Sequence, residues 1–359
     1  MNDRSDDEPR RANVIGTGLI GGSIGLALRD RGWHVSAYDV DQEVERQAVL
    51  LGVADETGLD PDAEVTVVAA PVGAISELVQ LALTKTSGLV TDVGSTKAAI
   101  CDSVDSPRFV GGHPMAGSEQ DGISGARADL FTDAMWVLTP GESTSEEAFA
   151  TVRTIVKSLG AESIALPPAV HDELVAQVSH VPHLTSAALM NLAANTSVEH
   201  RPLLRLAAGG FRDMTRISAG RAVIWPDICV ANREAIVVGL DRLIDALGAT
   251  RNLVAEGNRA GLYALLDSAR TARLNLPVGY GQAENASELA VPIPDRPGEI
   301  AAIATLAAEL DVNILDLEIS HSGEGSQGVL LLVVDAAKGE RLVGGLMARG
   351  YRPTLRELE

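Results

Sequence analysis

Short apolar runs alternate with helical repeats over residues 11–167 of the chain. A short apolar run bounded by turn residues predicts a buried strand, and apolar residues that recur every three or four positions predict a helix. The strands predicted in this way cover residues 12–15, 34–38, 64–69, 89–91, 109–110, 135–138 and 162–165. Because strands that alternate with helices indicate a parallel sheet covered on both faces, we expect a doubly wound α/β domain.

The pattern changes after Pro167-Pro168, and the middle of the chain shows helical repeats only. From residue 170 to residue 274 strand signals are nearly absent, and residues 225–256 are apolar at spacings of three and four. We therefore expect an all-α domain over residues 168–282. Its apolar faces exceed what its own residues can cover, which suggests that two copies pair through it as a homodimer.

The last part of the chain returns to strand signals after a turn-rich segment, residues 276–287. Over residues 288–359 the order is strand, helix, strand, strand, helix and strand, which predicts a small ferredoxin-like domain. At the other end of the chain, residues 1–10 are rich in charged side chains and are expected to form a disordered tail.

Composition and charge exclude several classes of protein. The chain of 359 residues has 29 Lys and Arg against 49 Asp and Glu, a net charge of −20, so nucleic acids and anionic membranes would repel it. Apolar residues make up 46% of the chain, yet no apolar run reaches the ~20 residues of a membrane span. Two cysteines, Cys101 and Cys229, and an N-terminus unlike a signal peptide lead us to expect a cytoplasmic protein.

A glycine motif, Gly16-Thr-Gly-Leu-Ile-Gly21, lies between the first predicted strand and the helix that follows it. Glycines at this spacing allow a tight turn, close approach of the backbone to a pyrophosphate, and close packing of helix on strand. The helix N-terminus then offers its free N–H groups to the phosphates. A dinucleotide is expected to contact Gly16, Gly18, Leu19, Ile20 and Gly21. Residues 11–167 are thus predicted to be a Rossmann-type cofactor domain.

Asp39, at the end of the second predicted strand, bears on the choice of cofactor. Its carboxylate can accept both ribose hydroxyls and would repel a 2′-phosphate, so NAD is favoured over NADP. Arg46, on the helix that follows, is near enough in sequence to reach the ribose and weaken this preference.

Three clusters of residues follow predicted strands, at the edge where a doubly wound sheet binds its ligands. They are residues 69–71, 91–97 and 111–119. Cofactor contacts are expected from Ala70, Pro71, Asp92 and Ser95, and substrate contacts from Gly117, Ser118 and Glu119. His113 lies among glycines in the third cluster, a position typical of a histidine that meets substrate. Ser95 either orients its imidazole or caps the helix that follows.

The helical region contributes two histidines and an arginine. His180 and His183 are three residues apart on one helix face, with Pro182 between them to kink the helix. No metal site is expected, because no nearby Cys or carboxylate clearly completes a set of ligands. Further along, the Arg216 guanidinium suits either a substrate carboxylate or an ion pair with a neighbour such as Asp213.

Five short motifs occur along the chain in a fixed order. They are Gly16-Thr-Gly-Leu-Ile-Gly-Gly-Ser23, Asp92-Val-Gly-Ser-Thr-Lys97, Gly112-His-Pro-Met-Ala-Gly117, Ser179-His-Val-Pro-His183 and Gly210-Phe-Arg-Asp-Met-Thr-Arg216. Together they resemble the prephenate/arogenate dehydrogenase family of tyrosine biosynthesis. The end of the chain, with Asp295-Arg-Pro-Gly298 and Asp311-Val-Asn-Ile314, resembles an ACT domain, a small module that often binds amino acids.

The resemblance implies NAD(P)-dependent oxidative decarboxylation of prephenate to 4-hydroxyphenylpyruvate, or of arogenate to tyrosine, and we favour prephenate. By position in the motifs, His113 is the catalytic histidine that accepts the hydrogen bond from the ring 4-hydroxyl, and Ser95 is the serine that supports it. His183 and Arg216 correspond to the substrate-binding histidine and to the arginine that holds a substrate carboxylate. His180 is expected at the same substrate site.

For the ACT-like domain, the resemblance suggests feedback by an amino-acid effector, tyrosine or phenylalanine. The expected contacts are Arg296, Gly298, Asn313 and Ile314. A module that is purely structural is an equal alternative for these residues.

Two other functions remain open from the sequence. One is a dehydrogenase of the 3-hydroxy-acid type, which has the same order of domains. Proteins of that type resemble a pattern with a catalytic lysine in the helical domain. Residues 170–274 of this chain contain no lysine, which is evidence against this function. The other is an amino-acid sensor that has lost activity, which the presence of Ser95, His113, His183 and Arg216 disfavours.

Overall fold

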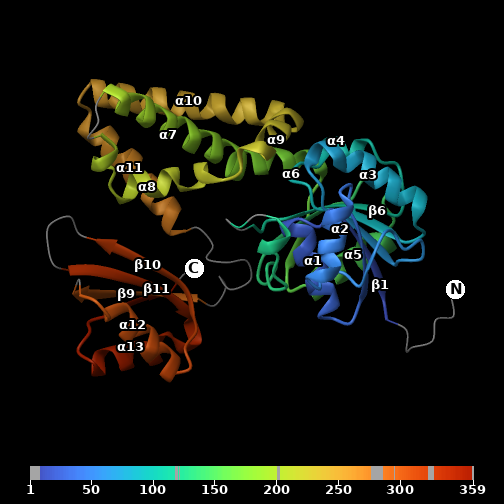
Figure 1. Ribbon diagram of the computed structural model, residues 1–359. Coiled ribbons are helices and arrows are strands. Elements are labelled where there is room, and N and C mark those ends of the chain that lie inside the picture. Colours follow the sequence, from blue (N-terminus) through green and yellow to red (C-terminus); the bar gives the residue numbers. More distant parts are fainter. Residues whose placement is uncertain are drawn as a thin grey trace. The chain divides into compact units, whose positions relative to one another are not determined.

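The computed structural model describes residues 9–117, 120, 122–199, 203–275, 286–294, 296–321 and 327–357 (Figure 1). The chain forms two compact units, Met1–Asn252 and Leu253–Glu359. The sequence predictions for residues 1–8, Ser118, Glu119 and most of the turn-rich linker lie outside the described residues.

An eight-stranded sheet forms the centre of the first unit, with strand order β3-β2-β1-β4-β5-β6-β7-β8. Its strands are β1 (Arg11–Ile15), β2 (His34–Tyr38), β3 (Glu56–Thr57), β4 (Val65–Val68), β5 (Leu89–Asp92), β6 (Phe109–Pro114), β7 (Met135–Thr139) and β8 (Glu162–Ala165). The α-helices between them are α1 (Leu19–Arg29), α2 (Gln42–Leu50), α3 (Val72–Lys85), α4 (Ala98–Asp102) and α5 (Glu146–Ser158). Each strand predicted from the sequence is present, and the short β3 is additional.

The sheet is parallel from β3 to β6, as predicted, and mixed beyond it. β7 pairs with β6 in the antiparallel direction, with His113 opposite Val137, whereas β8 is parallel to β7. A parallel neighbour needs a long crossover, usually a helix, over one face of the sheet. Between β6 and β7 the described residues form only a short 3-10 turn, Ile123–Gly125. The chain therefore returns alongside β6 in the opposite direction.

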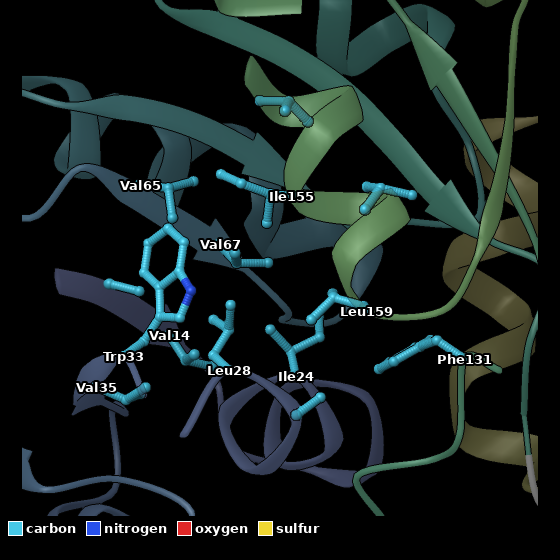
Figure 2. Close-up of a cluster of buried hydrophobic side chains, with 14 of the residues drawn as sticks. Val14, Ile24, Leu28, Trp33, Val35, Val65, Val67, Phe131, Ile155 and Leu159 are labelled. Carbon is cyan, nitrogen blue, oxygen red and sulfur yellow. The ribbon is translucent and has the colours of Figure 1, made fainter. Parts of the chain in front are cut away.

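Two apolar cores cover the two faces of this sheet. Adjacent strand residues point to opposite faces, so Val67 belongs to one core and Val68 to the other. In the first core, Leu28 of α1 and Leu159, the C-cap residue of α5, lie near Val67 in Figure 2. In the second core, α3 and α4 pack over the opposite face. Helices thus cover both faces and leave the carboxyl ends of the parallel strands at one edge.

The predicted all-α region begins in the first unit and continues into the second. Its helices are α6 (Pro168–Val175), α7 (Val181–Glu199), α8 (Gly209–Thr215), α9 (Trp225–Ala231) and α10 (Arg233–Ala255), followed by α11 (Arg259–Leu274) in the second unit. A π-helical turn, Ala176–His180, joins α6 to α7 just before Pro182. Proline lacks an N–H and its ring crowds the preceding turn, which a wider turn relieves. The predicted kink is therefore a π-turn that ends at His180.

The second unit also contains a four-stranded antiparallel sheet with strand order β10-β11-β9-β12. Its elements are β9 (Ala286–Pro294), α12 (Glu299–Glu309), β10 (Ile314–His321), β11 (Gln327–Asp335), α13 (Ala336–Ala348) and β12 (Thr354–Glu357). This is the βαββαβ order that the sequence predicted, with one core between sheet and helices. Across the described parts of the chain, no helix is both long and apolar enough to span a membrane.

Replacing Leu28 by Ala tests the first core. The Leu28 side chain is fully buried, so the substitution leaves a cavity and should lower the free energy of unfolding by about 2–5 kcal/mol. Leu50→Ala is the matched control, because Leu50 is 83% exposed and its truncation should change stability by less than about 0.5 kcal/mol. Urea unfolding followed by circular dichroism measures both variants. Equal losses would contradict the place of Leu28 in the core.

Candidate active site

The glycine loop between β1 and α1 has the shape that a dinucleotide requires. Gly16 adopts φ +86°, and a Cβ there would lie 2.5 Å from the Ala69 carbonyl oxygen, while a Cβ on Gly21 would overlap the Gly16 carbonyl. A Cβ on Gly18 would meet nothing within 4 Å, so this side of the loop is open. α1 begins at Leu19 without a side-chain cap, which leaves its first N–H groups for an anion. The loop therefore fits a pyrophosphate.

The carboxylate of Asp39, just after β2, lies against this loop. It accepts a hydrogen bond from the Thr17 N–H at 3.2 Å, and the Asp39 N–H donates to the Glu45 carboxylate at 3.0 Å. The guanidinium of Arg46 is paired with Glu43 at 2.6 Å. Because a second carboxylate lies beside Asp39 and the nearby cation is paired, the site favours the ribose hydroxyls of NAD over a 2′-phosphate.

Four more residues predicted to contact the cofactor lie at the start of α1 or just before α3. Leu19 and Ile20 pack against the first core and Ala70 against the second, while Pro71 is the N-cap residue of α3. Each lies at the carboxyl edge of the sheet, where the sequence placed it. Their contacts with the cofactor stay a prediction.

A buried ion pair between Asp92 and Lys97 organises the loop after β5. Both side chains are fully buried, and Lys97 Nζ donates to Asp92 Oδ2 and, at 2.8 Å, to the Gly112 carbonyl. Asp92 also accepts from the Gly94 N–H at 2.8 Å and the Gly112 N–H at 3.2 Å. A buried pair is tolerated when its remaining groups are bonded in this way. The pair joins β5 to β6 one residue before His113, and nothing in the pattern of residues indicated that Lys97 is buried.

His113 forms a chain of hydrogen bonds with two residues that the sequence reasoning missed. Its Nδ1 atom lies 2.9 Å from His171 Nε2, and His171 Nδ1 lies 2.7 Å from Asp172 Oδ1. His171 and Asp172 are buried on α6, and His113 is half-buried at the end of β6. The feature of the sequence that could have indicated these two residues is a His-Asp dipeptide in the first turns of the helical region, next to apolar residues.

The Asp172 carboxylate also connects α6 to the Rossmann-type sheet. It accepts hydrogen bonds from the Lys97 N–H at 2.7 Å and the Ala98 N–H at 2.9 Å, where α4 begins. The expected alternative that Ser95 caps this helix is therefore wrong, because a carboxylate distant in sequence takes that place. Asn232 donates to the Asp172 carbonyl at 2.8 Å and contacts His180 Nδ1 at 3.2 Å. These contacts hold His180 in the interior.

His183 and His180 contact the same tryptophan in different ways. The His183 ring stacks on Trp225, with centroids 3.6 Å apart and planes 14° apart, whereas His180 meets Trp225 edge-on at 6.1 Å. No group of three potential metal ligands exists among the residues that the structure describes. The two imidazoles are thus held by an aromatic ring and an amide.

The other predicted site residues lie around this network. Ser95 is half-buried, and its hydroxyl forms no hydrogen bond with the described residues, so His171 and not Ser95 holds the His113 ring. Gly117 is exposed after β6. Arg216 is exposed and begins the 3-10 turn Arg216–Ala219, which packs against α7, the helix that carries His183.

His113 and His180 are neutral near pH 7. Burial lowers the pKa of His113 well below the usual value for histidine, and the nearby His171, Lys97 and His180 add to the effect. Burial also lowers the pKa of His180 to about 4, although the Asp172 carboxylate opposes it, and lowers the pKa of His183. A neutral imidazole at the edge of the sheet can accept a proton from a bound ligand.

Fold and site together define a class, the NAD-dependent dehydrogenases that pair a Rossmann-type domain with a helical one. Two family models cover these domains. Residues 24–165 match the nucleotide-binding domain of prephenate dehydrogenase, and residues 167–268 match its dimerization domain.

Known proteins with similar sequences and structures belong to the same family as these models. The prephenate dehydrogenase of Bacillus subtilis (strain 168) is 33% identical over 336 residues, 88% of this chain and 90% of that protein. The crystal structure of A. aeolicus prephenate dehydrogenase with hydroxyphenyl propionate and NAD+ has a TM-score of 0.71 at 26% identity, covering 76% of this chain and 100% of that one. Synechocystis arogenate dehydrogenase has a TM-score of 0.65 at 31% identity, covering 73% and 98%. The chain belongs to the prephenate dehydrogenase family.

The lowered histidine pKa values predict how stability depends on pH. His113 and His180 are neutral in the folded protein but titrate near 6.5 when unfolded, so the unfolded chain binds more protons as the pH falls below about 6.5. Between about pH 7 and about pH 5, His180 alone should lower the free energy of unfolding by about 2 kcal/mol. Urea unfolding of the wild type and His180→Gln over this range measures the effect. The variant should show a shallower dependence, and parallel curves would contradict the assignment.

Proposed function

We propose that the chain catalyses the NAD-dependent oxidative decarboxylation of prephenate to 4-hydroxyphenylpyruvate, a step in L-tyrosine biosynthesis. Family membership and the 33% identity with the B. subtilis enzyme support this function. The observation that carries the proposal is that the imidazole of His113 is neutral and held in one orientation. It lies near the end of β6, at the sheet edge that also carries the glycine loop, and its neutral ring is held at Nδ1 by His171.

The reaction requires a proton acceptor at the ring 4-hydroxyl. Bound NAD supplies the hydride acceptor. As the carbon that bears the hydroxyl becomes a carbonyl, Nε2 of His113 accepts the hydroxyl proton, which a neutral imidazole can do at neutral pH. Loss of CO2 then makes the ring aromatic, so the side chains need form no covalent intermediate.

Three further residues have proposed roles toward the substrate. Ser95, on the loop after β5, supports the hydroxyl beside His113. His183 on α7 and Arg216 on the turn packed against α7 bind the substrate, with the guanidinium on a carboxylate. Local positive charge is needed for a dianionic substrate in a chain of net charge −20. His180 and residues 117–119 complete the proposed substrate site.

Arogenate is the second candidate substrate. It differs from prephenate only in the side chain, an amino acid in place of a keto acid, so few contacts are needed to separate the two. The resemblance to Synechocystis arogenate dehydrogenase, at 31% identity, favours this candidate. We favour prephenate because the B. subtilis relative is more similar and matches 88% of this chain.

A second copy of the chain is the proposed partner of the helical region. The match of residues 167–268 to a dimerization domain supports a homodimer. Large apolar side chains are exposed on α7, α9 and α10: Leu192, Val230, Val237, Val238, Ile244 and Leu247. Exposed apolar side chains in such number mark an association surface, and pairing would bury them.

The βαββαβ part of the second unit is proposed to be an ACT-like regulatory domain that binds tyrosine or phenylalanine. Arg296 and Gly298 precede α12, and Asn313 and Ile314 follow it. Because α12 has 11 residues, these pairs are about 16 Å apart along the helix axis, too far for one amino acid to touch both within one chain. The effector is therefore proposed to lie between two copies.

His113→Asn is the substitution that tests the function. Asparagine keeps a polar group of similar size but cannot take up the hydroxyl proton, so kcat for prephenate should fall by roughly 10²–10⁴-fold. Absorbance of NADH at saturating prephenate measures this, and titration calorimetry should show NAD affinity within about twofold of wild type. A loss of NAD affinity equal to the loss of turnover would contradict the assignment.

Steady-state rates with prephenate and with arogenate, each with and without tyrosine, test the choice of substrate and the regulation. We expect kcat/KM for prephenate to exceed that for arogenate by at least about tenfold, and tyrosine to reduce the rate. Rates reversed between the substrates would identify an arogenate dehydrogenase. No NADH from either substrate would support the inactive sensor instead.

A further inference from the structure

We infer that His171 and Asp172 are positioning residues of this reaction, which fix the protonation site of His113 and take up the charge that it receives. The inference rests on the proposed function. Its structural basis is the pair of hydrogen bonds from His113 Nδ1 to His171 Nε2 at 2.9 Å and from His171 Nδ1 to Asp172 Oδ1 at 2.7 Å. His171 and Asp172 are buried, so water competes little with these bonds.

The direction of each hydrogen bond follows from the Asp172 end. Its two oxygens accept backbone N–H groups, from Lys97 at 2.7 Å and from Ala98 at 2.9 Å, as an ionised carboxylate does. A carboxylate only accepts, so a neutral His171 must carry its proton on Nδ1 and present Nε2 as an acceptor. His113 Nδ1 then donates to that acceptor, which leaves the lone pair of His113 on Nε2 for the substrate hydroxyl.

The proton that His113 accepts can be passed on with all atoms balanced. When the substrate O–H bond breaks and a bond forms to His113 Nε2, the His113 Nδ1–H bond breaks and that proton bonds to His171 Nε2. His113 is again neutral, and His171 is an imidazolium whose Nδ1–H faces the Asp172 carboxylate. When CO2 leaves and the carbonyl oxygen becomes a phenolate, the proton returns by the same atoms through His113 Nε2 to that oxygen, so the product is a phenol and both histidines are neutral again.

Electrostatics favour this movement of charge. A cation on His113 is opposed by burial and by the neighbouring Lys97 and His180. A cation on His171 lies 2.7 Å from a carboxylate oxygen. Among the described residues there is no second group to which His113 could pass the proton. The His113 ring has no other hydrogen bond to them, and Nδ1 of His180 already contacts the Asn232 amide.

Two substitutions at one position separate orientation from charge uptake. In His171→Gln the amide oxygen can still accept from His113 Nδ1–H, but the side chain cannot carry a proton; His171→Phe removes both abilities. We expect His171→Gln to lower kcat by roughly 10²-fold with KM for prephenate and NAD affinity within about twofold, and His171→Phe to lower kcat further. His34→Gln, half-exposed on β2, is the control and should keep wild-type kcat. Wild-type kcat in His171→Gln would overturn the inference.

Nuclear magnetic resonance tests the tautomer without turnover. In ¹⁵N–¹H spectra of histidine side chains, assigned with His113→Asn, His113 should carry its proton on Nδ1 in the wild type and in His171→Gln. A proton on Nε2 of His113 in the wild type would overturn the inference. Because this measurement needs no substrate, inactivity toward prephenate would refute the proposed function separately.

Discussion

The carboxylate of Asp172 is the group on which the arrangement of the site depends. It accepts the two backbone N–H groups at the start of α4 and the ring N–H of His171, so one buried side chain joins α6 to the sheet and orients an imidazole. An ionised group is costly to bury without partners, and three donors supply them here. Loss of the carboxylate would leave these donors unpaired in the interior, which is destabilising.

The hydrogen bonds around Asp172 close into a ring. Lys97 donates its backbone N–H to Asp172 and its Nζ to Asp92 and to the Gly112 carbonyl, and the residue after Gly112 is His113. His113 leads through His171 back to Asp172. Because all members except the half-buried His113 are buried and each is satisfied by the next, the network favours one arrangement of β5, β6 and α6. His113 is thus held by the same contacts that join the two domains of the first unit.

Local patterns were sufficient for most of the fold and for the position of the glycine loop. The bounds of β2 and β8, the glycine loop with Asp39, and the βαββαβ order follow from short-range periodicity and turn residues. The antiparallel direction of β7 could not be predicted from these patterns, because the residues before it do not indicate whether the chain crosses the sheet or turns back. Burial of Lys97 was also invisible, since a lysine after a strand is usually solvated.

The sequence by itself determined which elements form, that the first domain has a dinucleotide loop, and that His113 lies near the end of a strand. Only the tertiary structure decided what holds His113, because its partner His171 is 58 residues away and the Asp172 contact to Lys97 spans 75 residues. Periodicity records which face of a helix is apolar, but it does not record which helix packs against it. The packing of α6 against α4 made that choice, and with it the hydrogen-bond partner and surroundings of His113.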